Sequence, residues 1–250
     1  MIIVGDIGNT ETKICLVNSN KKIIKKINFK TNSLNLSLLK KYFKKNNLKR
    51  NQIKKCLFSS VVPNSFKKIK IFFKNFYKIK CFELKNLPLN YLLKIKVNKK
   101  QVGSDRIANA IGLLSKKNNY IILDFGTATT FDVLIKNTYY GGVIAPGVSL
   151  SLETLIDKAS LIPNLSLKKT NKVIGINTVS AVRSGFFWGY TGLIKNIINL
   201  IKRETGKSFQ IIITGGFSYL FKNSLKLNVK VYNDITINGL IKASNLIKLR

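Results

Sequence analysis

The sequence contains no histidine and only ten acidic residues among its 250 positions. Without histidine, a Ser-His or Cys-His nucleophile pair is excluded, and so is a zinc site that uses imidazole. General-base chemistry is left to a carboxylate, or to a lysine or tyrosine of lowered pKa. The few acidic residues are therefore the first catalytic candidates; they are Asp6, Glu11, Glu83, Asp105, Asp124, Asp132, Glu153, Asp157, Glu204 and Asp234.

Cysteines and long apolar runs are scarce as well. The three cysteines, Cys15, Cys56 and Cys81, are widely spaced among apolar neighbours, which indicates reduced core residues rather than a disulfide framework or a CxxC metal site. No apolar run reaches the roughly 18 residues of a membrane helix. The first residues, "MIIVGDIGNT", show neither a basic leader nor a small-residue cleavage site. We therefore expect a cytoplasmic protein with no membrane partner.

The chain is strongly basic. It has 44 Lys and Arg but only 10 Asp and Glu, which gives a formal net charge of +34. Such an excess is typical of nucleic-acid binding, where basic side chains neutralise phosphates. Here, however, the lysines are spread over the whole chain together with Ile and Asn. This scatter favours compositional drift over a specific nucleic-acid site. The positive field still attracts small anions such as nucleotides.

Hydrophobic periodicity predicts strands interleaved with helices, which is the pattern of an α/β fold. The expected strands are residues 2–6, 13–18, 22–29, 55–60, 78–84, 120–124, 130–135, 139–144, 209–214 and 228–232. The expected helices are residues 34–46, 64–76, 104–117, 148–158, 177–203 and 235–247.

The sequence repeats itself once. The segment "IIVGDIGNTETKICLVN" near the start is echoed by "YIILDFGTATTFDVLIKN" in the middle, and Asp6 and Gly8 match Asp124 and Gly126 at one offset of 118 residues. Each copy reads as a strand, an Asp-x-Gly turn with small hydroxyl or amide residues, and a second strand. The repeat predicts two related lobes whose hairpin turns face one another across a cleft.

Such turns suit phosphate. Glycine lets backbone N–H groups approach phosphate oxygens, and Thr hydroxyls add donors. Asp6 can act there only through a cation or water, while Lys13 offers a point charge. A single Asp-x-Gly turn is equally a tight hairpin, but two copies in register favour the phosphate interpretation.

A second candidate site is "VGSDRIANAIG", residues 102–112. Asp105 and Arg106 stand at the expected start of a helix, where N–H groups and the helix dipole favour anions. The arginine fork fits a carboxylate or phosphate, and Asp105 can accept a proton from an attacking hydroxyl. The alternative is a helix cap with a surface ion pair.

Three further stretches are notable. "IIITGGF" at 211–217 predicts a buried strand and a Gly-Gly turn against which a planar ring can lie. "GGVIAPG" at 141–147 indicates loop geometry. "GINTVSAVRSGFFWGYTG" at 175–192 predicts a long helix whose small residues suit a dimer seam.

Together, "DIGNTETK", "GSDR", "DFGTATTFD", "GGVIAPG", "NT" at 177–178 and "TGG" resemble the type III pantothenate kinases, in their order and approximate spacing. The match runs from Asp6 to the helix after Asp234. The resemblance implies two duplicated ribonuclease-H-like lobes of the acetate and sugar kinase/actin superfamily. It places the first phosphate loop and GSDR in residues 1–110, and the second phosphate loop and adenosine turn in 111–250.

The resemblance also implies roles for individual residues. Asp105 would accept the proton, Asp124 would bind a monovalent cation, potassium or ammonium, and magnesium would accompany ATP. Thr178 would contact the substrate across a homodimer interface. The ATP contacts would be Asp6, Ile7, Gly8, Asn9, Thr10, Glu11, Thr12, Lys13 and Thr127. The pantothenate contacts would be Gly103, Ser104, Asp105, Arg106 and Thr178.

The expected reaction is ATP-dependent phosphorylation of pantothenate to 4'-phosphopantothenate, the first step of coenzyme A biosynthesis. One alternative is a kinase for another small hydroxy acid or sugar, and another is a transcription-accessory or nucleic-acid-binding relative. The chain departs from the family before GSDR, where "KIKVNKKQV" replaces a run with Tyr and Pro, and Tyr91 lies at the wrong spacing to substitute.

Overall fold

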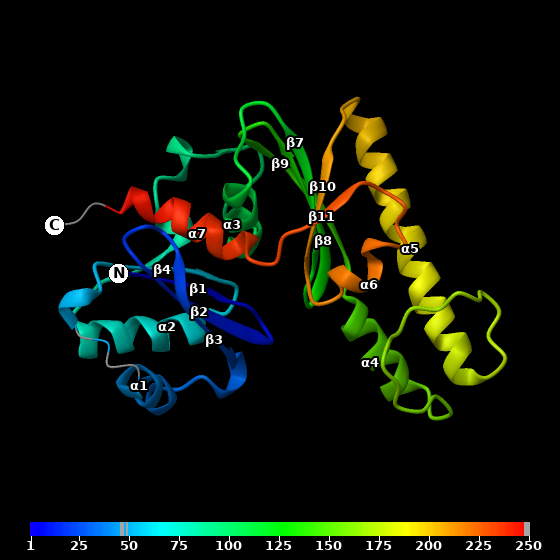
Figure 1. Ribbon diagram of the computed structural model, residues 1–250, viewed down its shortest axis with the longest axis horizontal. Coiled ribbons are helices and arrows are strands. Elements are labelled where there is room, and N and C mark those ends of the chain that lie inside the picture. Colours follow the sequence, from blue (N-terminus) through cyan, green and yellow to red (C-terminus); the bar gives the residue numbers. More distant parts are fainter. Residues whose placement is uncertain (46–47, 49, 248–250) are drawn as a thin grey trace. The chain divides into compact units, whose positions relative to one another are not determined.

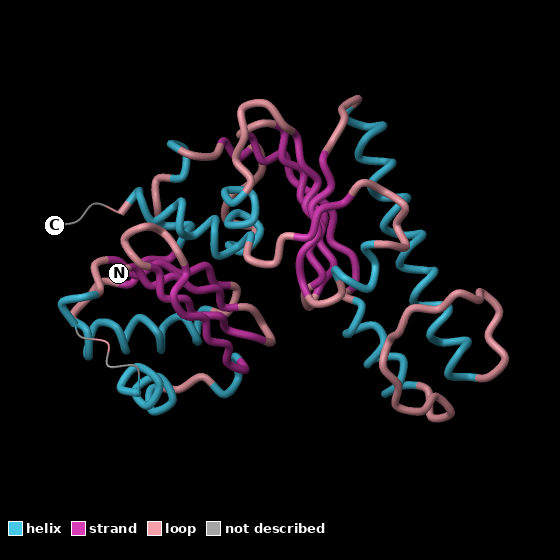
Figure 2. The backbone as a smooth tube through the Cα atoms, viewed as in Figure 1, coloured by secondary structure: helices cyan, strands magenta, loops and turns pink. Residues whose placement is uncertain are grey.

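The computed structural model describes every residue except 46, 47, 49 and 248–250. The chain forms two compact units. The first comprises Met1–Leu114, Asn137–Tyr139 and Asp234–Arg250, and the second comprises Ser115–Lys136 and Tyr140–Asn233. Each unit is built around a β-sheet with helices packed on it (Figures 1 and 2).

The first unit contains a five-stranded sheet in the order β3-β2-β1-β4-β5. Strand β1 is antiparallel to β2 and parallel to β4, and β4 is parallel to β5, so β1, β4 and β5 end at the same edge. The strands are β1 (Ile2–Ile7), β2 (Glu11–Val17), β3 (Ile23–Lys30), β4 (Lys55–Ser60) and β5 (Cys81–Glu83).

Helices cover both faces of this sheet (Figure 1). On one face, α1 (Leu36–Lys45) and α2 (Pro63–Phe72) enclose an aromatic core that includes Phe43, Phe72 and Phe73. A π-helical turn, Phe73–Tyr77, continues α2. The other face carries α3 (Ser104–Gly112) and α7 (Ile235–Ala243). The short elements are Thr31–Ser33, Arg50–Gln52, Leu84–Asn86, Leu89–Tyr91, β6 (Lys94–Ile95) and Ser244–Leu246.

Helices α3 and α7 pack so closely that glycines of each lie against the backbone of the other. A Cβ on Gly239 would lie 1.8 Å from the Ala108 carbonyl oxygen, and one on Gly112 would lie 2.6 Å from the Ile235 carbonyl oxygen. Glycine is therefore required at both positions. The Thr236 hydroxyl also donates to Asn109 Oδ1 at 2.7 Å, so α7 is locked to the helix that begins with GSDR.

A six-stranded sheet has the order β11-β10-β7-β8-β9-β6. Most of it belongs to the second unit, while β6 and the first two residues of β9, which pair with each other, are assigned to the first unit. Besides β6, the strands of this sheet are β7 (Asn119–Phe125), β8 (Ala128–Ile135), β9 (Thr138–Pro146), β10 (Gln210–Gly215) and β11 (Val229–Val231). The helices of the second unit are α4 (Val148–Lys158), α5 (Thr178–Thr205) and α6 (Ser218–Lys222).

The core of the second unit lies between this sheet and α5. Phe221 stacks between Phe125 and Phe187, with ring centroids 5.2 and 5.9 Å away. Asn177 begins α5 with a capping box, in which its side chain accepts from the Ser180 N–H and the Ser180 hydroxyl bonds the Asn177 backbone.

The predicted duplication is confirmed in the sheets. The order β9-β8-β7-β10-β11 repeats the order β3-β2-β1-β4-β5, and β7 pairs antiparallel with β8 and parallel with β10 just as β1 pairs with β2 and β4. Asp6 and Asp124 occupy equivalent positions near the ends of β1 and β7. The α/β fold class follows directly from this arrangement.

Each of the ten predicted strands has a counterpart, but the strand predicted at 78–84 is limited to Cys81–Glu83, and other differences lie at helix ends. The predicted helix 104–117 ends at Gly112, because the Leu113 and Leu114 N–H groups bond carbonyls three residues back and Lys242 Nζ bonds the Gly112 carbonyl at 2.6 Å. The predicted helix 34–46 is seen to Lys45, and residue 46 lies outside the described residues. Strand β6 and helix α6 were not among the predicted ranges.

The compact units also differ from the predicted lobes 1–110 and 111–250. The first unit continues to Leu114 and takes in the C-terminal segment from Asp234, because α7 packs on α3 and β1. Among the described residues, no helix combines the length and apolar content that crossing a membrane requires.

Candidate active site

The turn between β1 and β2 is fixed by a hydrogen bond within the turn and by two hydrogen bonds from Thr31. The Gly8 N–H donates to the Glu11 carbonyl at 3.0 Å. From the segment after β3, the Thr31 hydroxyl donates to the Gly8 carbonyl at 2.7 Å, and the Thr31 N–H donates to the Thr10 carbonyl at 2.9 Å. The backbone of the predicted phosphate loop is therefore held in place before any ligand binds.

Burial divides the residues predicted to contact ATP. Ile7 and Thr12 are completely buried. Because the single Thr31 hydroxyl proton goes to Gly8, the Thr12 hydroxyl must donate to Thr31 Oγ1, 2.9 Å away. These two side chains support the loop and do not face a ligand. Exposed or partly exposed side chains belong to Asp6, Asn9, Thr10, Glu11 and Lys13.

Asp6 has a partner that the sequence analysis missed. The Ser59 hydroxyl donates to Asp6 Oδ1, and Ser59 lies beside Asp6 in the parallel pairing of β1 with β4. Ser59 is completely buried, so this bond fixes the orientation of the carboxylate from within the fold. The available signal was the position of Ser59, which ends the apolar strand "KCLFSS" much as Asp6 ends "IIVGDI".

The GSDR element begins α3 as predicted, with Gly103 as the N-cap. The Arg106 N–H donates to Asp105 Oδ1 at 2.8 Å, so the carboxylate folds over the helix start. A Cβ on Gly103 would lie only 2.4 Å from that oxygen. Burial raises the pKa of Asp105, while the Arg106 N–H and charge oppose the shift only in part. A raised pKa suits a general base that works near neutral pH.

Ser104 and Glu83 attach this helix start to the first sheet. Ser104 is buried, and its hydroxyl donates to Glu83 Oε1 at 2.5 Å. Glu83 ends β5, at the sheet edge where Asp6 and Ser59 are the last residues but one of β1 and β4. The structure thus brings the first phosphate loop and GSDR to one edge of one sheet.

In the second unit, two glycine-containing segments pack on the Gly126–Thr127 turn and on Phe125 before it. A Cβ on Gly147 would lie 2.0 Å from the Thr127 carbonyl oxygen. A Cβ on Gly215, which has φ of 87°, would lie 2.5 Å from the Phe125 carbonyl oxygen. The loop geometry predicted for "GGVIAPG" is wrong, because residues 141–146 form the end of β9. The last glycine, Gly147, follows the strand and packs on the predicted second phosphate turn.

Asp124 and Thr178 also belong to the second unit. Asp124 is partly buried near the end of β7, and Thr130 and Thr214 are its neighbours in register on β8 and β10. Carboxylate and hydroxyl oxygens in this setting fit a hard cation.

Thr178 is exposed at the first position of α5. Within the described part of the chain, no group of three or more His, Cys, Asp or Glu side chains could hold a metal ion.

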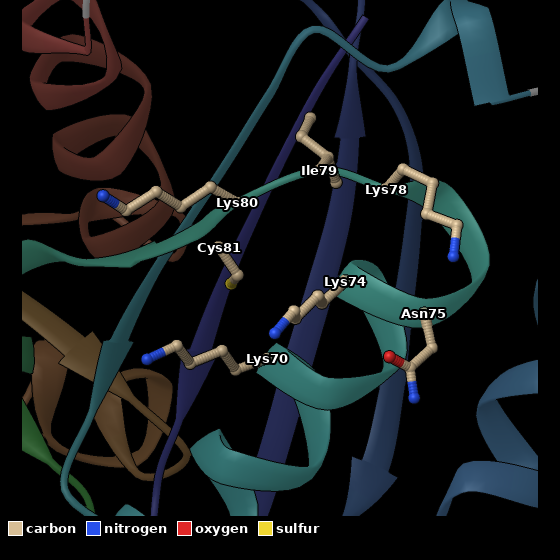
Figure 3. Close-up of a pocket in the computed structure, with 7 residues that line it drawn as sticks. All are labelled: Lys70, Lys74, Asn75, Lys78, Ile79, Lys80 and Cys81. Atoms are coloured by element: carbon tan, nitrogen blue, oxygen red, sulfur yellow. The ribbon is translucent and has the colours of Figure 1, made fainter.

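A separate cavity of about 370 Å³ lies in the first unit, between the end of α2 and β5 (Figure 3). None of the residues predicted for the ATP or substrate site lines it. The lining consists of Lys70, Lys74, Asn75, Lys78, Ile79, Lys80 and Cys81.

Sequence comparison identifies the family. The model of the type III pantothenate kinase family matches residues 2–200. A type III pantothenate kinase from Pelagibacter ubique (strain HTCC1062) is 69% identical over 248 residues, which cover 99% of this chain and 100% of that protein. The chain belongs to the type III pantothenate kinase family. A second relative of the same name, from Jannaschia sp. (strain CCS1), is 40% identical over 195 residues, covering 76% of this chain and 74% of its own.

Solved structures agree on the fold. A conserved Campylobacter jejuni protein, named provisionally as a Baf family transcriptional activator, matches with a TM-score of 0.63 and 19% identity over 96% of each chain. The activator of the 2-hydroxyisocaproyl-CoA dehydratase from Clostridium difficile, solved with bound ADPNP, matches with a TM-score of 0.53 and 12% identity over 97% of this chain and 92% of its own. These likenesses show that the predicted α/β fold is shared with proteins of known structure.

The packing of Gly147 generates a prediction. In Gly147→Ala the new methyl group must displace the Thr127 carbonyl, so we expect nucleotide affinity to fall at least about tenfold, or ~1.4 kcal/mol, the scale of overpacking. Titration with a fluorescent ATP analogue measures this. Gly192→Ala on α5 is the matched control, because its methyl meets nothing within 4 Å. Equal affinities in both variants would contradict the supporting role of Gly147.

Proposed function

We propose that the chain transfers the γ-phosphoryl group of ATP to the primary hydroxyl of pantothenate, giving 4'-phosphopantothenate in the first step of coenzyme A biosynthesis. The observation that carries this conclusion is the 69% identity to a type III pantothenate kinase across the full length of both chains. The geometry supports it, because a partly buried carboxylate and an arginine stand together at the start of α3.

Asp105 is the proposed general base. The hydroxyl oxygen of the substrate attacks the γ-phosphorus while its proton passes to a carboxylate oxygen of Asp105. The new P–O bond forms as the bond to the β-phosphate oxygen breaks, and ADP leaves. Such transfers have a loose transition state, so positioning and charge neutralisation supply most of the rate.

Arg106 and the helix start would bind the acceptor. The guanidinium would pair with the pantothenate carboxylate in a two-point contact. Gly103 would leave room for the Asp105 carboxylate, and its absence of a side chain lets the substrate approach the backbone. Ser104 is buried against Glu83, so its part in the substrate site would be through the backbone.

Each of the two turns is a proposed contact for ATP phosphates. Kinases of this family use ATP with a divalent metal ion, which in this proposal is magnesium and would offset the charge of the phosphates. Asp6 would hold it through water, with the carboxylate oriented by Ser59. The N–H groups of Gly8 and Gly126 bond the carbonyls of Glu11 and Ala128 within the turns. The exposed backbone at Asn9, Thr10 and Thr127 would therefore donate to phosphate oxygens, and Lys13 would add a positive charge.

A monovalent cation, potassium or ammonium, is proposed at Asp124. Its carboxylate would be a ligand, with Thr130 and Thr214 nearest in register. When bound, the cation offsets negative charge beside the triphosphate. The residues fit this role because all three supply oxygen donors, which potassium prefers to sulfur or nitrogen.

A homodimer is also part of the proposal. In the segment between α4 and α5, Leu161, Ile174 and Ile176 are between 84% and 90% exposed, and exposed apolar side chains are typical of an interface. Exposed small residues follow on α5 at Ala181, Gly185 and Gly189. Thr178 comes before them as the first residue of α5, and it would reach the substrate of the partner subunit. The cytoplasmic location stays a prediction.

Pantothenate-dependent ATP consumption in potassium buffer tests the function. We expect Asp105→Asn to keep its fold and ATP binding but to lose at least about 10²-fold in rate, the scale of general-base catalysis. The control, Asp157→Asn, removes an exposed carboxylate from α4 and should retain the wild-type rate.

Replacing potassium by sodium should lower the wild-type rate if Asp124 holds the cation.

The competing functions give different outcomes. A kinase for another acid or sugar would consume ATP faster with that compound than with pantothenate. ATP hydrolysis that ignores pantothenate, together with DNA binding that is equally tight at about 50 and 200 mM salt, would contradict the kinase proposal and favour a specific nucleic-acid-binding relative.

The pH dependence should report Asp105 directly. The base must be ionised to accept a proton, so activity is lost as pH falls through its pKa. Because burial raises the pKa of Asp105, the acid limb of kcat/KM should lie above about 3.9, the ordinary aspartate value. A pH profile of Asp105→Asn should lack this limb. An unchanged acid limb in that variant would assign the titration to another group.

A further inference from the structure

The segment that leads into GSDR is held by one lysine. Lys85 Nζ donates to the Lys100 carbonyl at 3.0 Å and to the Val102 carbonyl at 2.8 Å. These two carbonyls belong to the three residues that precede Gly103. A lysine fifteen or more positions away thus fixes the backbone on which Asp105 and Arg106 are mounted.

Glu83 completes the same set of contacts. Its Oε2 accepts from the Lys85 N–H at 2.7 Å, and its Oε1 accepts from the Ser104 hydroxyl at 2.5 Å. Glu83 and Lys85 therefore bind residues 100–104 through both a backbone and a side-chain contact. We call these two residues, with their four hydrogen bonds, the β5 clamp.

The clamp holds a helix start that has no side-chain cap of its own. Gly103, the N-cap of α3, has no side chain with which to cap the helix, and the nearest element before it is the two-residue strand β6. Ser104 is 1% exposed and Val102 is 7% exposed, so the held segment is packed as well as hydrogen-bonded. The position of Asp105 then depends on the end of β5.

The charges within the clamp are balanced. Burial raises the pKa of Glu83, and the Ser104 hydroxyl, the Lys85 N–H and the Lys85 charge oppose that rise. A buried carboxylate needs such compensation. A chain with ten acidic residues in all places one of them here, beside the start of α3.

We propose that Glu83 and Lys85 are positioning residues for phosphoryl transfer, which hold residues 100–104 so that Asp105 reaches the acceptor hydroxyl and Arg106 the acceptor carboxylate. This inference rests on the proposed function. A purely structural role predicts lower stability with unchanged kinetics in the folded protein. A positioning role predicts a defect confined to the acceptor substrate, because the ATP loop is held by Thr31 and Ser59 instead.

The test compares Lys85→Met with Lys55→Met. Both changes remove a lysine that donates to a main-chain carbonyl, since Lys55 Nζ bonds the Ser244 carbonyl at 3.0 Å at the other end of β4. We expect Lys85→Met to lower kcat/KM for pantothenate about 10- to 100-fold, the effect of a small misplacement of reacting groups. The KM for ATP should stay at the wild-type value. Lys85→Arg, which can still donate to both carbonyls, should recover most of the activity.

The melting temperatures decide between the two roles. We expect Lys85→Met and Lys55→Met to lose similar stability, while only the former loses pantothenate turnover. If Lys85→Met does not fold, Glu83→Gln, which keeps one acceptor oxygen, is measured in the same way. Wild-type kinetics in the folded variant, or equal losses for pantothenate and ATP in step with stability, would overturn the clamp.

The two proposals fail differently. A wild-type protein that does not phosphorylate pantothenate refutes the proposed function, whatever the variants do. A wild-type protein that phosphorylates pantothenate, with a Lys85→Met variant of equal kcat/KM, refutes only the clamp.

Discussion

The attachment of the α3 helix start to the carboxyl edge of the five-stranded sheet is the constraint on which the rest of the proposed site depends. Three parallel strands end there, and their last residues include Asp6, Ser59 and Glu83. Parallel strands bring their carboxyl ends to one edge, where ligands bind in many open sheets. The hydrogen bond from Ser104 to Glu83 places the candidate base at this edge rather than elsewhere on the helix-covered face.

Because the architecture is duplicated, each unit has one glycine-containing turn at an equivalent position, after β1 in the first unit and after β7 in the second. In the first unit, Thr31 fixes the turn by hydrogen bonds, whereas in the second Gly147 and Gly215 support it by close packing. The same supersecondary unit is therefore stabilised in two ways. Side chains around the turns have diverged, with Lys13 beside Asp6 and Thr130 beside Asp124, which suits one turn to charge neutralisation and the other to a cation.

Local features were predictable from the sequence, and long-range partners were not. The strands, the repeat and the helix start at GSDR follow from periodicity and turn residues, which act over a few positions. The contacts of Ser59 with Asp6 and of Lys85 with Val102 join residues far apart in the chain, so no local pattern marks them. The burial of Ile7 and Thr12 and the packing of α7 on α3 likewise depend on tertiary structure.

The central claim is that Asp105, held at this edge, is the group that meets the acceptor hydroxyl. A crystal structure with pantothenate and a non-hydrolysable ATP analogue tests it most directly. The account predicts the primary hydroxyl within about 2.6–3.2 Å of an Asp105 carboxylate oxygen, with the pantothenate carboxylate on Arg106. A hydroxyl bound to another group, with Asp105 out of hydrogen-bonding reach, would contradict it.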